Sequence, residues 1–287
     1  MSPDSVVTQI LNGLSFGGLL FLLSAGFTLV FGLMRIVNLG HGAFYLVGGY
    51  VGSTVLVTTG SFWLAVLAGG IAVAVLGAGV ERLLLRRIRG QELPEVLLTI
   101  GVAFVLGDLS LAIWGGDPIQ MTTPAYVSGT VDLGVVSYPR FRIVVALLGI
   151  AVGAALWYLQ SRTRVGAIVR AGVDDREMVA ALGIDITKVF TGVFLLGALL
   201  AGLSGVVGGA FLSLVPGADV EILLFALVVV IIGGLGSLPG AAVGSILVGL
   251  LDAFGRALVP DLSFFTLFAP MAIVLVLRPH GLLGRPV

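Results

Sequence analysis

Long apolar runs dominate this chain, and most of them are long enough to cross a lipid bilayer as a helix. A bilayer core of about 30 Å takes roughly 20 helical residues. Hydrophobic residues make up 58% of the 287 residues and the mean hydropathy is +1.17, which leaves too little polar surface for a water-soluble fold. The sequence therefore predicts an integral membrane protein, and we expect a single transmembrane domain over residues 1–287.

The apolar segments predict an all-α, polytopic membrane helical bundle with eight or nine transmembrane segments. Glycine and polar residues interrupt two of the regions, 36–58, which carries Asn38 and His41, and 214–240. The pattern leaves open whether one of these regions holds a broken or re-entrant helix. The nine apolar segments are 10–33, 36–58, 62–85, 96–115, 141–159, 188–214, 221–236, 240–259 and 263–278.

Basic residues collect on one side of the predicted membrane. If all nine segments cross, the loops of one side hold Arg35, Arg82, Arg86, Arg87, Arg89, Arg162, Arg164, Arg170, Arg176, Lys188, Arg278 and Arg285. The other side holds only Arg140, Arg142 and Arg256. The positive-inside rule then predicts an outer N-terminus and a cytoplasmic C-terminus in a multi-pass cell membrane protein. On the outer side, turn residues and short alternating stretches in 116–140 predict a small β-hairpin.

Several functional classes find no support in the residues. The 15 basic and 15 acidic residues balance, which argues against a nucleic-acid partner. The chain has no cysteine and two distant histidines, so it predicts no metal site, and no grouping of serine, histidine and acid suggests an enzyme. Its one lysine, Lys188, lies outside any Gly-x-x-x-x-Gly-Lys loop, so ATP-driven transport would need a separate ATPase subunit.

The longest cytoplasmic segment, 161–188, carries the signals of a short helix. Asp174 and Glu177 have the spacing of a capping box, and an apolar i, i+3, i+4 face follows before Gly183. We expect a helix over 174–182 that lies across the membrane surface and docks a partner subunit. The alternative is a loop helix that packs only on its own bundle.

Ionisable residues inside membrane spans are functional candidates, because charge in lipid is costly. Asp252 has Arg256 one turn later, which favours a structural i, i+4 ion pair near the outer end. Asp108 has no evident partner and is a candidate for the translocation path, unless it reaches the outer interface. Asn38 and His41 are the other path candidates, although a lone histidine is more often a hydrogen-bonded structural residue.

Four stretches of the chain resemble the LivH-type permease subunits of branched-chain amino acid ABC importers. They are Ala25 to Tyr45 (AGFTLVFGLMRIVNLGHGAFY), Arg170-Ala171 through Ala180-Ala181-Leu182-Gly183-Ile184, the turn Gly233 to Gly240 (GGLGSLPG), and the ending Arg278 to Pro286 (RPHGLLGRP). They follow the family's order and span nearly the whole chain. The resemblance implies a transmembrane permease domain over 1–287 in a cell inner membrane, carrying branched-chain amino acids or a related small polar solute.

The resemblance also implies partners: a paralogous LivM-type permease, two cytoplasmic ABC ATPase subunits that bind ATP and Mg, and an extracytoplasmic substrate-binding protein. No cofactor is then expected in this chain itself. The short cytoplasmic helix would be the coupling helix that sits in a cleft of the ATPase, at residues 174–183. Its candidate residues are Asp174, Asp175, Arg176, Glu177, Met178, Ala181, Leu182 and Gly183.

One alternative belongs to a different class of transporter. In a proton-coupled secondary transporter or channel, Asp108 or Asp252 would couple to protons. The importer hypothesis predicts that Asp108→Asn still transports when partners and ATP are present, whereas the alternative predicts the opposite.

Overall fold

The computed structural model describes residues 2–134 and 136–284, and helices form nearly all of its regular structure, which confirms the all-α class. The helices are α1 (Pro3–Met34), α2 (His41–Thr59), α3 (Phe62–Val80), α4 (Arg86–Ile88), α5 (Glu92–Trp114), α6 (Arg140–Arg162), α7 (Arg164–Asp174), α8 (Arg176–Ala181), α9 (Ile186–Leu212), α10 (Ala218–Gly233), α11 (Leu238–Leu258) and α12 (Ser263–Leu277). A π turn, Glu81–Leu85, joins α3 to α4, and 3-10 turns lie at Ala125–Val127 and Pro260–Leu262.

Seven helices in the described residues are long and apolar enough to cross a membrane: α1, α2, Phe62–Ile88 (α3 with α4), α5, α6, α9 and α11. Each of the nine predicted segments coincides with a helix, but α10 and α12 have only 16 and 15 residues. At 1.5 Å per residue, α10 spans about 24 Å, less than the bilayer core.

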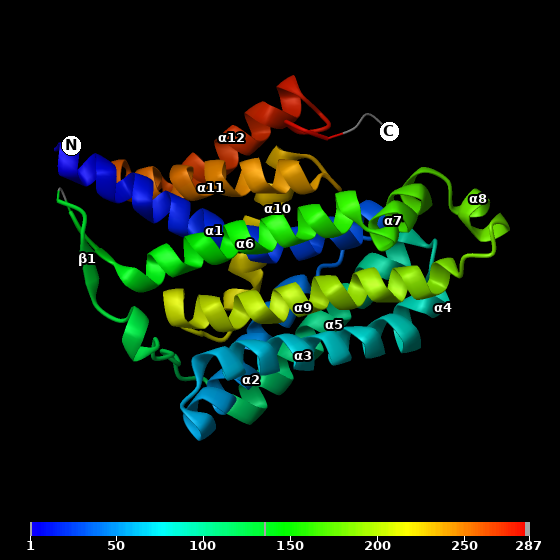
Figure 1. Cartoon of the computed structure of the whole chain (residues 1–287), viewed down its shortest axis with the longest axis horizontal. Coiled ribbons are helices and arrows are strands. Elements are labelled where there is room, and N and C mark those ends of the chain that lie inside the picture. Colours follow the sequence, from blue (N-terminus) through cyan, green and yellow to red (C-terminus); the bar gives the residue numbers. More distant parts are fainter. Residues whose placement is uncertain (1, 135, 285–287) are drawn as a thin grey trace.

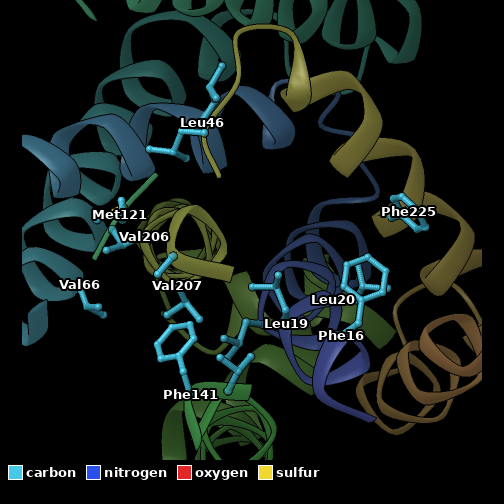
Figure 2. Close-up of a cluster of buried hydrophobic side chains, with 14 of the residues drawn as sticks. Phe16, Leu19, Leu20, Leu46, Val66, Met121, Phe141, Val206, Val207 and Phe225 are labelled. Carbon is cyan, nitrogen blue, oxygen red and sulfur yellow. The ribbon is translucent and has the colours of Figure 1, made fainter. Parts of the chain in front are cut away.

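The long helices run side by side along one axis (Figure 1). At one end, here the hairpin end, the N-terminus lies near the antiparallel pair β1 (Thr130–Asp132) and β2 (Ser137–Pro139), which confirms the predicted hairpin. At the other end, here the α8 end, α7 and α8 project from the bundle. Apolar side chains fill the space between helices, where Phe16 and Leu20 of α1 lie in one core with Phe225 of α10 and Val207 of α9 (Figure 2).

Glycines set the closest helix contacts. A Cβ added to Gly17 of α1 would lie 2.8 Å from the Ser245 carbonyl oxygen of α11, and one added to Gly48 of α2 would overlap Gly202 of α9. Only glycine lets these backbones approach so closely, as small residues do at helix interfaces in membranes.

Both interrupted regions hold a helix that begins inside the bundle. After α1, Arg35 takes a left-handed conformation (φ 56°) and the chain turns back, so that His41 Nε2, at the start of α2, lies 3.1 Å from the Leu23 carbonyl oxygen. The segment 213–217 leads in the same way into α10. The two helix starts meet, because a Cβ on Gly42 would overlap the Asp219 carbonyl oxygen.

The two halves of the chain repeat one order of elements with opposite direction. The helices α1, α2, α3 and α5 correspond to α9, α10, α11 and α12, and α1 begins at the hairpin end whereas α9 begins at the α8 end. Arg35 after α1 and Ser213 after α9 are the two positive-φ residues other than glycine in the described chain. The first helix of each half packs on the third helix of the other half: α1 packs on α11, and α9 packs on α3. This is the inverted-repeat arrangement found in many transporters.

Candidate functional site

A cavity of about 830 Å³ lies toward the hairpin end of the bundle. It is walled by the first half of α1, the start of α6, the segment that leads into α10, and the last turns of α11. Small-molecule sites in proteins range from about 300 to 1,000 Å³, so this volume is ample for a solute of metabolite size.

Arg142 of α6 supplies a fixed positive charge to the cavity wall. Its guanidinium donates to Asn12 Oδ1 at 2.5 Å and lies over the Phe211 ring, 4.8 Å from the centroid. The Tyr138 hydroxyl donates to the same Asn12 oxygen at 3.1 Å. The arginine is therefore held by a hydrogen bond and a cation–π contact.

Asp252 and Arg256 of α11 and Glu221 of α10 bring both signs of charge to the cavity lining. Arg256 Nε lies 2.9 Å from each Asp252 carboxylate oxygen, which confirms the predicted i, i+4 ion pair. Glu221, one turn into α10, is exposed at the cavity. A solute with a carboxylate and an ammonium group would find opposite charges on these walls.

Aromatic side chains form the apolar part of the lining. The Phe16 ring meets Phe225 edge-on at 5.3 Å between centroids and stacks on Phe211 at 6.3 Å. These three rings line the cavity beside the charged groups. An aliphatic side chain placed against them would leave water, which is favourable.

Ser213, also in the lining, holds a backbone conformation (φ 83°, ψ 156°) that is close to glycine-only space. Its hydroxyl donates to Gln120 Oε1, and Ile119 and Leu214 form a backbone bridge beside it. Strained residues of this kind persist where surrounding contacts hold them, often at functional sites.

The three predicted path residues lie apart from this cavity lining. Asn38 and His41 are buried together in the turn before α2, where Asn38 Oδ1 accepts from Gly40 N at 3.1 Å. His41 Nε2 donates to the Leu23 carbonyl oxygen, which is the hydrogen-bonded structural role. Asn38 Nδ2 and His41 Nδ1 have no hydrogen-bond partner among the described residues. Asp108 is exposed on the face of α5 that points away from the rest of the bundle.

The cytoplasmic segment 161–188 holds two short helices, and the second of them, α8, lies within the predicted range 174–182. Asp174 ends α7, and α8 begins after a break, with Asp175 Oδ1 accepting from Met178 N at 2.9 Å. The predicted cap at Asp174 is thus wrong by one residue, because its neighbour is also an aspartate and takes the cap position. The side chains of Arg176 and Glu177, like that of Asp174, lie outside the described part of the structure.

The apolar face predicted for this helix points away from the bundle. Met178 is 58% exposed and Leu182 is 72% exposed, whereas Val179 between them is buried. Ala181 is exposed, and Gly183 ends the segment with φ 78°. Figure 1 shows α8 as the outermost element of its end. An exposed apolar pair of this kind is typical of a docking surface.

Sequence reasoning missed most of the cavity lining. It counted Arg142 only as a charge and did not single out Glu221 or Ser213. The available signal was a second arginine in the first turn of a predicted span, and that signal does not say what the arginine contacts.

Comparison with known proteins places the chain by sequence. Residues 9–277 match the family described as branched-chain amino acid transport system, permease component. The high-affinity branched-chain amino acid transport system permease protein BraD of Pseudomonas aeruginosa is 30% identical over 97% of this chain and 95% of the relative. LivH of Escherichia coli, with the same description, is 28% identical over 97% of this chain and 95% of the relative. A probable LivH of Methanocaldococcus jannaschii is 24% identical over 96% and 92%.

No solved structure gives a significant match. The family match covers nearly the whole chain, and the inverted halves and the polar cavity are the architecture of a membrane transporter. This chain belongs to the branched-chain amino acid transport permease family.

Proposed function

We propose that this chain is the permease subunit of an ATP-driven importer that forms, with a paralogous permease, the path for branched-chain amino acids or a related small solute. The observation that carries the proposal is the cavity with both signs of charge beside an aromatic wall, in a member of this family. Two ATPase subunits and an outer substrate-binding protein would complete the importer.

In this proposal the cavity receives the amino acid from the outside. Arg142 attracts the carboxylate and Glu221 attracts the ammonium group, while the aliphatic side chain packs on Phe16 and Phe225. The relatives named for branched-chain amino acid transport support this class of solute.

The segment 174–183 couples the path to the ATPases. Met178 and Leu182 insert into a cleft of the ATPase, and closure of the ATPases on ATP moves α7 and α8. Gly172 of α7 lies against Leu33 of α1 and Ile186 of α9, so the movement passes directly to the first helix of each half. The halves then rock between outward-open and inward-open states.

The proton-coupled alternative lacks a matching site. Asp252 is ion-paired with Arg256, and Asp108 lies on the outer surface of α5 rather than in the cavity. Asp252 lines the cavity, but Arg256 pairs its carboxylate there, and Asp108 lies outside the cavity lining.

The test is purification of a tagged copy from its native membrane in mild detergent, with mass spectrometry of the associated proteins and leucine uptake after reconstitution. We expect a Walker-motif ATPase, a second permease, and uptake that requires ATP.

Arg142→Ala should raise the KM for leucine about tenfold or more, as expected for loss of a charged hydrogen bond of about 1.5–3 kcal/mol. Arg140→Ala, two residues earlier and exposed, is the matched control. Recovery of the chain alone, with flux in liposomes that lack ATP, would overturn the proposal.

A further inference from the structure

One transmembrane helix presents to the outside of the chain a stripe of residues that contains a single charged side chain. The residues Leu97, Gly101, Phe104, Asp108 and Leu111 of α5 are spaced by four, three, four and three, and all five are exposed. This spacing places them along one face of the helix, as in the seam of a coiled coil. We call this face the α5 stripe.

Two features of α5 are unsuited to a lipid-facing helix. Asp108 is 16 residues from Glu92, about 24 Å along a helix of 23 residues, which puts its carboxylate inside the apolar part of the span. No hydrogen bond or ion pair joins it to the described residues, and a carboxylate that faces hydrocarbon is costly. In addition, a Cβ on Gly101 or Gly107 would meet nothing within 4 Å. No other helix of the described chain therefore packs closely on these glycines.

The exposed face of α6 differs from the α5 stripe in the residues that it presents. Its exposed face carries Leu147 and Ile150, with Trp157 and Tyr158 near the α8 end, and no charged residue between them. Apolar residues with an aromatic band at one end are typical of a surface that contacts lipid. Its glycines turn inward, where a Cβ on Gly149 would lie 2.9 Å from Gly18 Cα of α1.

We infer that the α5 stripe is the contact surface for the second permease subunit, which presents a hydrogen-bond donor or a basic group to Asp108. Gly101 lets the partner helix approach closely, Phe104 packs on it, and the donor satisfies the carboxylate. The inference rests on the proposed function, since it names the surface on which that partner binds.

The charge of Asp108 argues for a different chain rather than a second copy. Two identical subunits in one membrane share their orientation, so their α5 helices would pack in parallel with equal depths facing each other. Asp108 would then meet the Asp108 of the copy, and the stripe itself contains no donor to separate two carboxylates. A paralogous subunit avoids this repulsion by carrying a complementary group at that depth.

Photo-crosslinking in the assembled transporter tests the inference without knowledge of the partner's residues. Benzoyl-phenylalanine replaces Phe104, which is 70% exposed, or Ile150 on α6, which is 68% exposed and serves as the matched control. After irradiation of native membranes, we expect an adduct with a second permease polypeptide at position 104 and none at 150. An adduct of two copies of this chain at 104, or lipid adducts alone, would overturn the inference.

Substitution of Asp108 supplies a second readout. Asp108→Leu should lose the second permease on purification, whereas Asp108→Asn, which keeps an acceptor oxygen, should retain it. If the stripe faced lipid, Asp108→Leu would be harmless to assembly, and that result would contradict us. Recovery of the ATPase and second permease without a crosslink at 104 would reject the surface while the proposed function stands. Failure to recover either subunit would reject both.

Discussion

Gly205 of α9 lies directly against α2, where an added Cβ would overlap the Tyr45 carbonyl oxygen. We predict that Gly205→Ala destabilises the protein by about 1–3 kcal/mol, because the backbones of two packed helices must separate. Thermal stability in detergent, followed by size-exclusion chromatography of heated samples, measures the effect. The matched control is Gly79→Ala in α3, where a Cβ would meet nothing within 4 Å. Gly79→Ala should be neutral or stabilising, because alanine favours a helix more than glycine does. Equal loss in both variants would show that this contact does not set the stability.

Ser213 allows strain to be separated from hydrogen bonding. Both Ser213→Ala and Ser213→Gly lose the hydrogen bond to Gln120, but only glycine relieves the backbone at φ 83° and ψ 156°. We therefore expect the glycine variant to be more stable than the alanine variant by about 1–3 kcal/mol. Thermal unfolding of the two purified variants compares them directly. A glycine variant no more stable than the alanine variant would show that this backbone carries no strain.

Sequence separation decides which of these residue contacts were predictable. The ion pair between Asp252 and Arg256 depends on helical spacing alone, and the sequence predicted it. The contact of Arg142 with Asn12 joins residues 130 apart, and it depends on how α6 packs on α1. The strain at Ser213 likewise arises from a bridge between distant segments, so no local pattern indicates it.

At the scale of elements, α8 offers a test of coupling that should leave the fold intact. Because Met178 and Leu182 are exposed, Met178→Arg with Leu182→Arg should not change thermal stability by more than about 0.5 kcal/mol. We expect the double variant to lose ATP-dependent uptake, since two charges would face the apolar cleft of the ATPase. Uptake and ATP hydrolysis are measured on the reconstituted complex.

The control for α8 is Leu283→Arg, an exposed apolar residue near the C-terminus at the same end of the molecule. It should keep both uptake and ATP hydrolysis. If the α8 variant also transports normally, the segment is a loop helix without a coupling role. If both variants lose uptake, a general charge effect at this end is the cause.

The existence of helices was more predictable than their ends. Long apolar runs predicted all nine of these helices, because burial in lipid leaves the backbone few alternatives to a helix. Seven of them, α3 taken with α4, are long enough to cross the membrane. The residues at which one helix ends and the next begins depended on a choice between neighbouring capping residues. Two adjacent aspartates offered two caps, and the structure uses Asp175 rather than Asp174. The break after Asp174, which makes α7 a separate amphipathic helix, followed from no strong signal such as proline or glycine.

For the molecule as a whole, the inverted repeat explains why the helices that follow two irregular turns begin side by side. Arg35 and Ser213 occupy equivalent positions after α1 and α9, and the helices that follow them begin in contact at Gly42 and Asp219. Two helix starts inside a membrane bundle are stable only where protein or a polar cavity surrounds them. The repeat was not visible in the sequence, because the halves differ in length and share architecture rather than identity.

The charge distribution predicts the orientation of this bundle in the membrane. Basic residues crowd the loops of the α8 end, so that end should face the cytoplasm and the hairpin end should face outward. The chain has no cysteine, so single cysteines report position cleanly. We expect Leu133→Cys, in the hairpin, to react with a membrane-impermeant maleimide in intact cells. Leu283→Cys should react only after permeabilisation, because it lies at the α8 end, which should face the cytoplasm. The reverse pattern of labelling would contradict this orientation and place the cavity at the cytoplasmic face, as in an inward-open state.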